Sequence, residues 1–133
     1  MPTFAEVETW ARSLPETTST PSYGGAPALR VNGRMFARLR AEMAEEADEL
    51  TGAPYGEVLM LRVADLGVKE ELLAADPRTF FTIAHYDGYP SVLVRLALAD
   101  PDELGELLLD AWLQRAPKRA HRAYEQTVGP LPG

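Results

Sequence analysis

Four residues that could carry chemistry stand within five positions of the segment TIAHYDGYPSVLVRL, at His85, Tyr86, Asp87 and Tyr89. A histidine beside an aspartate can act as a general base or orient a nucleophile. However, the chain has only two histidines and no cysteine, and no spacing of His, Asp or Glu matches a known metal motif. Asp87-Gly88 is a turn pair, and Pro90 restricts the backbone just before the apolar run. We therefore predict a turn that shapes the fold, and no enzyme, metal site or cofactor.

Two segments carry local positive charge in a chain whose net charge is −7. The first, residues 17–41, has no acidic residue and contains Arg30, Arg34, Arg38 and Arg40. The second, residues 111–124, also lacks acids and contains Arg115, Lys118, Arg119 and Arg122. The i, i+3, i+4, i+7 spacing of this second set would align it along one helix face, where it could contact a phosphate backbone. The alternatives are a solvated helix face and a charged edge strand.

The first basic segment is predicted to be a β-hairpin. Asn32-Gly33 is typical of a type I′ turn, because both central residues of that turn need a positive φ. Strict alternation about this turn would place on one face Leu29, Val31 and Phe36, with Arg34, Arg38 and Arg40 towards its ends. The other face would hold Ala28, Met35, Ala37 and Leu39.

Helices and further strands are expected around this hairpin. Thr3 and Glu6 have capping-box spacing and predict a first helix, which Pro15 ends. Residues 16–27 are expected to be a loop, because they are rich in Thr, Ser, Gly and Pro. Strands are predicted over 57–63, 79–83 and 91–98, with a helix near 68–77. Residues 41–52 fit either a short acidic helix or an exposed excursion.

The last large helix has the clearest sequence signals. Asp100 has the type of an N-cap, Pro101 stands at the first helical position, and Glu103 completes a capping box. Pro117 should interrupt this helix before a second, offset helical segment.

The order α-β-β-β-α-β-β-α predicts an α+β fold with two layers, in which helices pack on one side of an antiparallel sheet. Hydrophobic residues make up 46% and charged residues 25%, as is ordinary for a globular chain, and we expect one domain over 1–133 with a tail frayed from about 126. The absence of cysteine, of a signal-like N-terminus and of an apolar run near 20 residues favours a soluble cytoplasmic protein, with no membrane partner.

The second half of the chain contains in succession ADP before a Phe-Phe pair, HYDGYP, VLVRL, DPDEL, DAW and APKR, and it follows the hairpin LRVNGRMFARL. With these motifs the chain from about Leu14 to Tyr124 resembles the MmcQ/YjbR-like family of small bacterial proteins. The chain departs from the family in the acidic stretch 41–56. The resemblance implies a double-wing or secretion-chaperone-like α+β domain with no assigned catalytic residues. The family is commonly labelled DNA-binding, a label that rests on similarity of shape to a viral transcription factor domain.

Two hypotheses of function follow. The first is a non-enzymatic DNA-binding protein that contacts phosphates through both basic segments, although an acidic pI near 4.8 is unusual for such a protein. The second is a protein- or ligand-interaction module without a nucleic-acid role. Its partner would occupy the sheet face or a cleft lined by His85, Tyr86, Tyr89 and Trp112.

Overall fold

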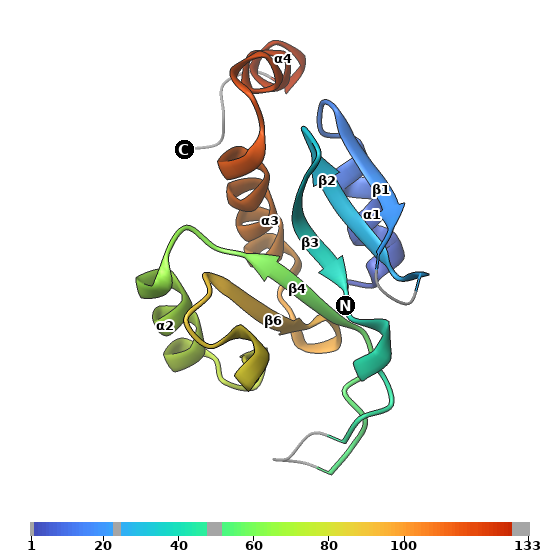
Figure 1. Ribbon diagram of the computed structural model, residues 1–133, viewed down its shortest axis with the longest axis vertical. Coiled ribbons are helices and arrows are strands. Elements are labelled where there is room, and N and C mark those ends of the chain that lie inside the picture. Colours follow the sequence, from blue (N-terminus) through green and yellow to red (C-terminus); the bar gives the residue numbers. More distant parts are fainter. Residues whose placement is uncertain (1, 23–24, 48–51, 129–133) are drawn as a thin grey trace.

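The computed structural model describes residues 2–22, 25–47 and 52–128 and forms a six-stranded antiparallel sheet with four α-helices (Figure 1). The strands are β1 (Thr17–Pro21), β2 (Pro27–Val31), β3 (Arg34–Leu39), β4 (Val58–Arg62), β5 (Phe80–Phe81) and β6 (Ser91–Arg95). The α-helices are α1 (Phe4–Arg12), α2 (Leu66–Ala75), α3 (Pro101–Arg115) and α4 (Lys118–Val128). Short 3₁₀ turns follow β3, β5 and β6, at Ala41–Met43, Ala84–Tyr86 and Leu96–Leu98. The strand order in the sheet is β1-β2-β3-β4-β6-β5.

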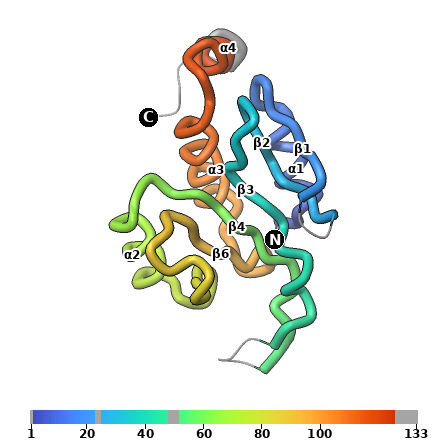
Figure 2. Tube along the Cα trace, in the orientation of Figure 1, coloured from blue at the N-terminus to red at the C-terminus, as the bar shows by residue number. Residues whose placement is uncertain are grey.

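The main core lies between one face of the sheet and helices α1, α2 and α3 (Figures 1 and 2). Its largest fully buried side chains include Trp112 of α3, Phe36 of β3 and Leu59 of β4. A smaller apolar cluster covers part of the opposite face, which we call the open face. It is built from Met43, Val58, Met60 and Leu93. The α+β class and the one-sided packing of helices are therefore confirmed.

Strand β1 is missing from the predicted order, because the composition of its residues predicts a loop. Thr17 to Pro21 pair with β2 at the edge of the sheet. The threonines favour extended structure, and Pro21 ends the strand at an edge, where a missing N–H costs no ladder bond. The strand is polar and only half-buried, so it carries no apolar alternation that would mark it in the sequence.

The hairpin has the predicted turn but contains a β-bulge. Asn32 and Gly33 have φ values of 52° and 72°, as a type I′ turn requires. Leu29 pairs with Ala37 whereas Arg30 pairs with Met35, so Phe36 is an extra residue in β3. Leu29, Val31 and Phe36 share the core face as predicted, and Met35 faces the other way.

Beyond this bulge the predicted alternation is wrong. Phe36 and Ala37 both face the helix-side core, and Leu39 packs against the same core. Arg38 is consequently turned to the open face, where it pairs with Met60 of β4. One inserted residue thus delivers an arginine to the opposite side of the sheet.

The remaining elements differ from prediction mainly at their ends. Strand β6 stops at Arg95, because a 3₁₀ turn at Leu96–Leu98 replaces its predicted end, and β5 holds only Phe80 and Phe81. The stretch 41–52 begins with a 3₁₀ turn and carries a bridge between Ala47 and Pro54, while residues 48–51 lie outside the described part. Helix α4 continues to Val128, beyond the predicted start of the frayed tail, whose last residues also lie outside the described part. Within the described residues, none of the helices combines the length and the apolarity needed to cross a bilayer.

Candidate functional site

The HYDGYP segment forms a compact turn between β5 and β6 and lies against the open face of the sheet. Its Tyr86 packs on the open-face apolar cluster. Backbone hydrogen bonds close the turn, from Asp87 N to Ala84 O at 3.0 Å and from Tyr89 N to Tyr86 O at 3.0 Å. Gly88 has a φ of 78°, which any residue with a Cβ adopts only with strain. The segment is therefore built as a turn, and it places two tyrosines beside the sheet.

A buried lysine from α2 holds this turn in place. Lys69 is 5% exposed, and its ammonium donates hydrogen bonds to the backbone oxygens of Tyr86 at 2.7 Å and Tyr89 at 3.0 Å. Burial lowers the pKa of Lys69, while the nearby Asp87 carboxylate acts in the opposite direction. The turn is thus fixed to the domain through its main chain.

Between the turn and the sheet runs a groove, made of two cavities that share four lining residues. The shared residues are Met35, Met60, His85 and Tyr86. One cavity, of about 530 Å³, is also lined by Arg34, Arg62, Tyr89, Ser91 and Arg115. The other, of about 490 Å³, is also lined by Ser22, Arg30 and Arg38. We refer to the whole as the open-face groove.

Three arginines at one end of the open-face groove have no carboxylate partner among the described residues. Arg34, Arg62 and Arg115 form no side-chain hydrogen bond or ion pair in residues 2–22, 25–47 and 52–128. The pKa of Arg62 is lowered by burial and by the positive charge of Arg115. The Nε atom of Arg62 is buried and has no hydrogen-bond partner within the same residues. Cations gathered in this way attract an anion.

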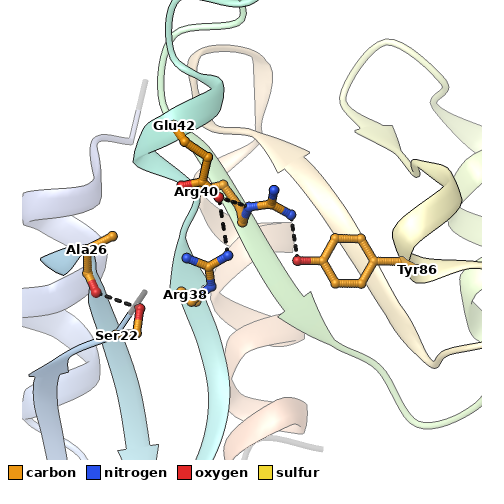
Figure 3. A network of polar contacts seen from close by, with 6 residues as sticks. All are labelled: Ser22, Ala26, Arg38, Arg40, Glu42 and Tyr86. Atoms are coloured by element: carbon orange, nitrogen blue, oxygen red, sulfur yellow. Dashed lines mark hydrogen bonds and ion pairs between the residues drawn. The ribbon is translucent and has the colours of Figure 1, made fainter. Parts of the chain in front are cut away.

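The other end of the groove is partly neutralised. The Glu42 carboxylate accepts hydrogen bonds from Arg38 at 3.3 Å and from Arg40, and Arg40 Nη1 donates to the Tyr86 hydroxyl at 2.7 Å (Figure 3). Burial alone would lower the pKa of Arg40, but its contacts with Glu42 and Tyr86 raise it overall. Arg38 is only 8% exposed, and its Nη1 lacks a partner among the described residues. This network positions the Tyr86 ring. Arg30 also lines this end of the groove, and its Nε donates to Thr20 Oγ1 at 3.2 Å.

The predicted basic stripe of the C-terminal segment is divided by the structure. Arg115 ends α3 and joins the open-face groove, whereas Lys118, Arg119 and Arg122 are exposed on α4. Arg119 makes a bidentate ion pair with Glu16, with Nη2 to Oε1 at 2.7 Å. This pair raises the pKa of Arg119. The break at Pro117 therefore separates one arginine of the set from the other three basic residues.

Of the residues of the predicted cleft, His85, Tyr86 and Tyr89 line the open-face groove. The Trp112 side chain is 0% exposed and lies in the helix-side core. Its Nε1 donates to Thr17 Oγ1 at 2.8 Å, and its ring packs near His121 and Tyr124. Trp112 thus joins α3 to β1 and α4 and takes no part in the groove.

Comparison with known proteins identifies the family of this chain. A family model described as YjbR matches residues 12–114. The chain belongs to the YjbR family. Relatives include uncharacterized protein Mb2600 of Mycobacterium bovis and uncharacterized protein Rv2570 of Mycobacterium tuberculosis, each 40% identical over 104 residues, or 75% of this chain and 81% of the relative. The crystal structure of Deinococcus radiodurans protein DR2400, with a DUF419 domain, matches with a TM-score of 0.70 at 22% identity. That match covers 100% of this chain and 94% of the other, and it shows a shared fold.

Within this YjbR domain, sequence reasoning missed two cationic residues that shape the groove. Arg62 ends β4 and Lys69 lies on α2, and neither belongs to a basic cluster in the sequence. The one signal for Arg62 is its place after the apolar run of a buried strand in EVLMLRV. That signal does not indicate which face of the sheet the side chain reaches. For Lys69 no sequence signal marks its burial.

Proposed function

We propose that this protein binds single-stranded DNA in the open-face groove, as a binding protein and not as an enzyme. The single observation that carries the proposal is the cluster of Arg34, Arg62 and Arg115 without a carboxylate partner in the described chain. Neutralising phosphates supplies most of the affinity of such proteins, so a local cluster can bind even in an acidic chain. The cytoplasmic location predicted from the sequence is compatible with this ligand.

The aromatic wall of the groove favours a single strand over a duplex. Tyr89 is 59% exposed and lines the same cavity as the three arginines. Exposed aromatic rings stack on bases whose faces are accessible, and each such contact contributes about 1–3 kcal/mol. Bases inside a duplex are stacked on one another and offer no face to Tyr89. The cavities of about 530 and 490 Å³ also suit nucleotide-sized units, because ligand sites span about 300–1,000 Å³.

The groove supports binding chemistry more than catalysis. Its polar residues are arginines, tyrosines, His85 and two serines, Ser22 and Ser91. Ser22 Oγ donates to the Ala26 carbonyl oxygen at 2.7 Å, and within the described residues His85 makes no side-chain hydrogen bond to either serine. A hydrolase would need a nucleophile held by a base, with the base oriented by a third group. The DNA-binding proposal therefore retains the hairpin arginines and Arg115 of the hypothesis drawn from the sequence and leaves out the basic face of α4.

The test is fluorescence anisotropy with labelled single-stranded and duplex DNA of the same sequence, titrated over a range of salt concentrations. We expect saturable binding that is tighter for the single strand and weakens linearly on a log–log plot as salt rises. The slope reports the number of phosphate contacts. Absence of binding at low salt would refute the proposal.

A second candidate is a small phosphorylated ligand, which the size of each cavity favours. Competition by a nucleoside monophosphate separates the two functions. If the mononucleotide binds as tightly as an oligonucleotide, the groove holds one unit and the DNA assignment is wrong. If affinity rises with strand length, the second candidate is excluded, because added nucleotides then find added contacts along the groove.

A further inference from the structure

The two ends of the open-face groove differ in charge compensation. Resting on the function proposed above, we infer that the end formed by Arg34, Arg62 and Arg115 binds a terminal phosphate monoester, as on the 5′ end of a DNA strand. The other end, with Arg30 and Arg38, would receive internal phosphodiesters. The groove would then recognise strand ends in preference to continuous strand.

Charge matching is the first argument. An internal phosphodiester carries one negative charge, whereas a phosphate monoester carries about −1.5 to −2 at neutral pH and presents three oxygens. Arg34, Arg62 and Arg115 supply three positive charges around one cavity. A diester would leave this end with excess positive charge, while a monoester compensates most of it. Planar guanidinium groups also match phosphate oxygens in geometry.

The second argument concerns Arg62 itself. Its Nε is buried without a partner among the described residues, and an unpaired buried donor costs free energy until an acceptor reaches it. Burial and the charge of Arg115 both disfavour the protonated guanidinium, which an anion held between the two would reverse. Arg62 and Arg115 are therefore poised for a ligand that carries strong acceptors and more than one charge.

The contrast with the opposite end is the third argument. Arg38 already shares the Glu42 carboxylate with Arg40, so that end has less uncompensated charge for its ligand. Between the ends lie Met35 and Met60, which offer an apolar floor. A bound strand would follow this order along the groove. Its doubly charged terminal phosphate would lie at the Arg62 end, a base would lie over the apolar floor, and a singly charged phosphate would lie at the Arg38 end.

The experiment compares oligothymidines that carry a fluorophore at the 3′ end and either a phosphate or a hydroxyl at the 5′ end. We expect the wild-type protein to bind the 5′-phosphorylated strand about tenfold more tightly, the effect of one added charge-assisted contact. Arg62→Gln and Arg115→Gln should each weaken the binding of both strands, because both side chains line the groove, and each should bring the ratio of the two affinities close to one. Arg122→Gln, on the exposed face of α4, is the matched control and should keep the full preference.

The outcomes distinguish the terminal-phosphate site from the DNA-binding function. Equal affinity of the wild-type protein for both strands overturns the terminal-phosphate site and leaves DNA binding standing. If no strand binds but thymidine 5′-monophosphate does, and Arg62→Gln abolishes that binding, the monoester site stands and the DNA function falls. A strand phosphorylated at 3′ and labelled internally shows whether the polarity is as inferred; a gain equal to that from the 5′-phosphate would contradict the 5′ assignment. Arg62→Lys keeps the charge, so its loss of the preference would identify the guanidinium geometry as the cause.

Discussion

The open-face groove and the exposed face of α4 both gather arginines, but they surround those arginines differently. On α4, Lys118, Arg119 and Arg122 are exposed, and Arg119 is already paired with Glu16. In the groove, Arg62 and Arg115 are half-buried and without a carboxylate partner in the described chain, beside an aromatic wall. Water screens the charges on α4, whereas partial burial strengthens those in the groove. The comparison shows that charge spacing alone does not identify a site, since the regularly spaced set Arg115, Lys118, Arg119 and Arg122 is divided between the groove and α4.

The largest expected effect distinguishes the open-face groove from the exposed face of α4. The double substitution Arg34→Glu/Arg115→Glu should weaken single-stranded DNA binding by about 100-fold or more. Each hydrogen bond between a guanidinium and a phosphate contributes about 1.5–3 kcal/mol, and each new carboxylate also repels phosphate. Fluorescence anisotropy at fixed salt measures the change.

The matched control is Lys118→Glu/Arg122→Glu on α4, which changes the net charge by the same amount. It should alter affinity by no more than about threefold, as screened charges outside the binding surface do. Equal reductions in affinity in the two double variants would mean that overall charge, and not the groove, governs binding.

The next prediction concerns Lys69, which anchors the turn to the domain. Lys69→Met should lower the free energy of unfolding by about 2–4 kcal/mol, because two partly buried carbonyl oxygens lose their donor. Urea unfolding followed by circular dichroism measures this change. Lys118→Met removes a charge from an exposed site and should change stability by less than about 0.5 kcal/mol. Similar values for the two variants would show that Lys69 does not secure the turn.

The aromatic wall provides a smaller effect. Tyr89→Ala should weaken binding of single-stranded DNA by about tenfold through loss of base stacking, with little change in stability because the ring is 59% exposed. Tyr89→Phe keeps the ring and should bind like the wild-type protein. If both variants lose affinity alike, the hydroxyl group binds the strand and stacking does not.

The smallest effect has the opposite sign. Glu42→Gln should tighten DNA binding about twofold to fivefold, because Arg38 and Arg40 would no longer share a carboxylate. Anisotropy at pH 7 measures this gain. A loss of affinity would mean that Glu42 serves the site by positioning the two arginines.

Glu42 also allows a prediction of how stability depends on pH in the acidic range. Burial by itself would raise the pKa of Glu42, but its hydrogen bonds and the charges of Arg40 and Arg38 lower it below the ordinary value of 4.5. A carboxyl group whose pKa is lower in the folded state than in the unfolded state stabilises the fold at pH values above its unfolded-state pKa. This contribution is lost as the pH falls through the folded-state pKa. Thermal unfolding between about pH 6 and pH 3 should therefore show a steeper acid loss in the wild-type protein than in Glu42→Gln.

Local signals in the sequence predicted most of the fold. Asn32-Gly33 and the Asp100-Pro101 start of α3 succeeded because backbone conformation at a turn or a helix end depends on a few neighbouring residues. Strand β1 was not predicted, because only its pairing with β2 identifies it and its polar sequence is that of a loop. The bulge at Phe36 was not predicted for a related reason, since packing on both sides of the sheet decides where an extra residue is accommodated.

The candidate site was predictable only in part. The hairpin arginines and the HYDGYP segment are each visible in the sequence, but only the folded chain puts Arg30 and Arg38 beside His85 and Tyr86. The spacing of Trp112 on α3 indicates a buried face, and the folded chain places its side chain in the helix-side core and away from the groove. Arg62 and Lys69 could not be found, since their roles depend on residues distant in the chain.

The anchoring of the turn by Lys69 has a consequence for how this site can change. Both acceptors of the Lys69 ammonium are main-chain oxygens, of Tyr86 and Tyr89, so replacing the side chain of His85 or Tyr89 leaves both hydrogen bonds in place. Substitutions at His85 or Tyr89 can therefore alter what the groove prefers while the scaffold stays in place. A library varied at these two positions, built on an unchanged Lys69, would explore new specificities at low risk of misfolding.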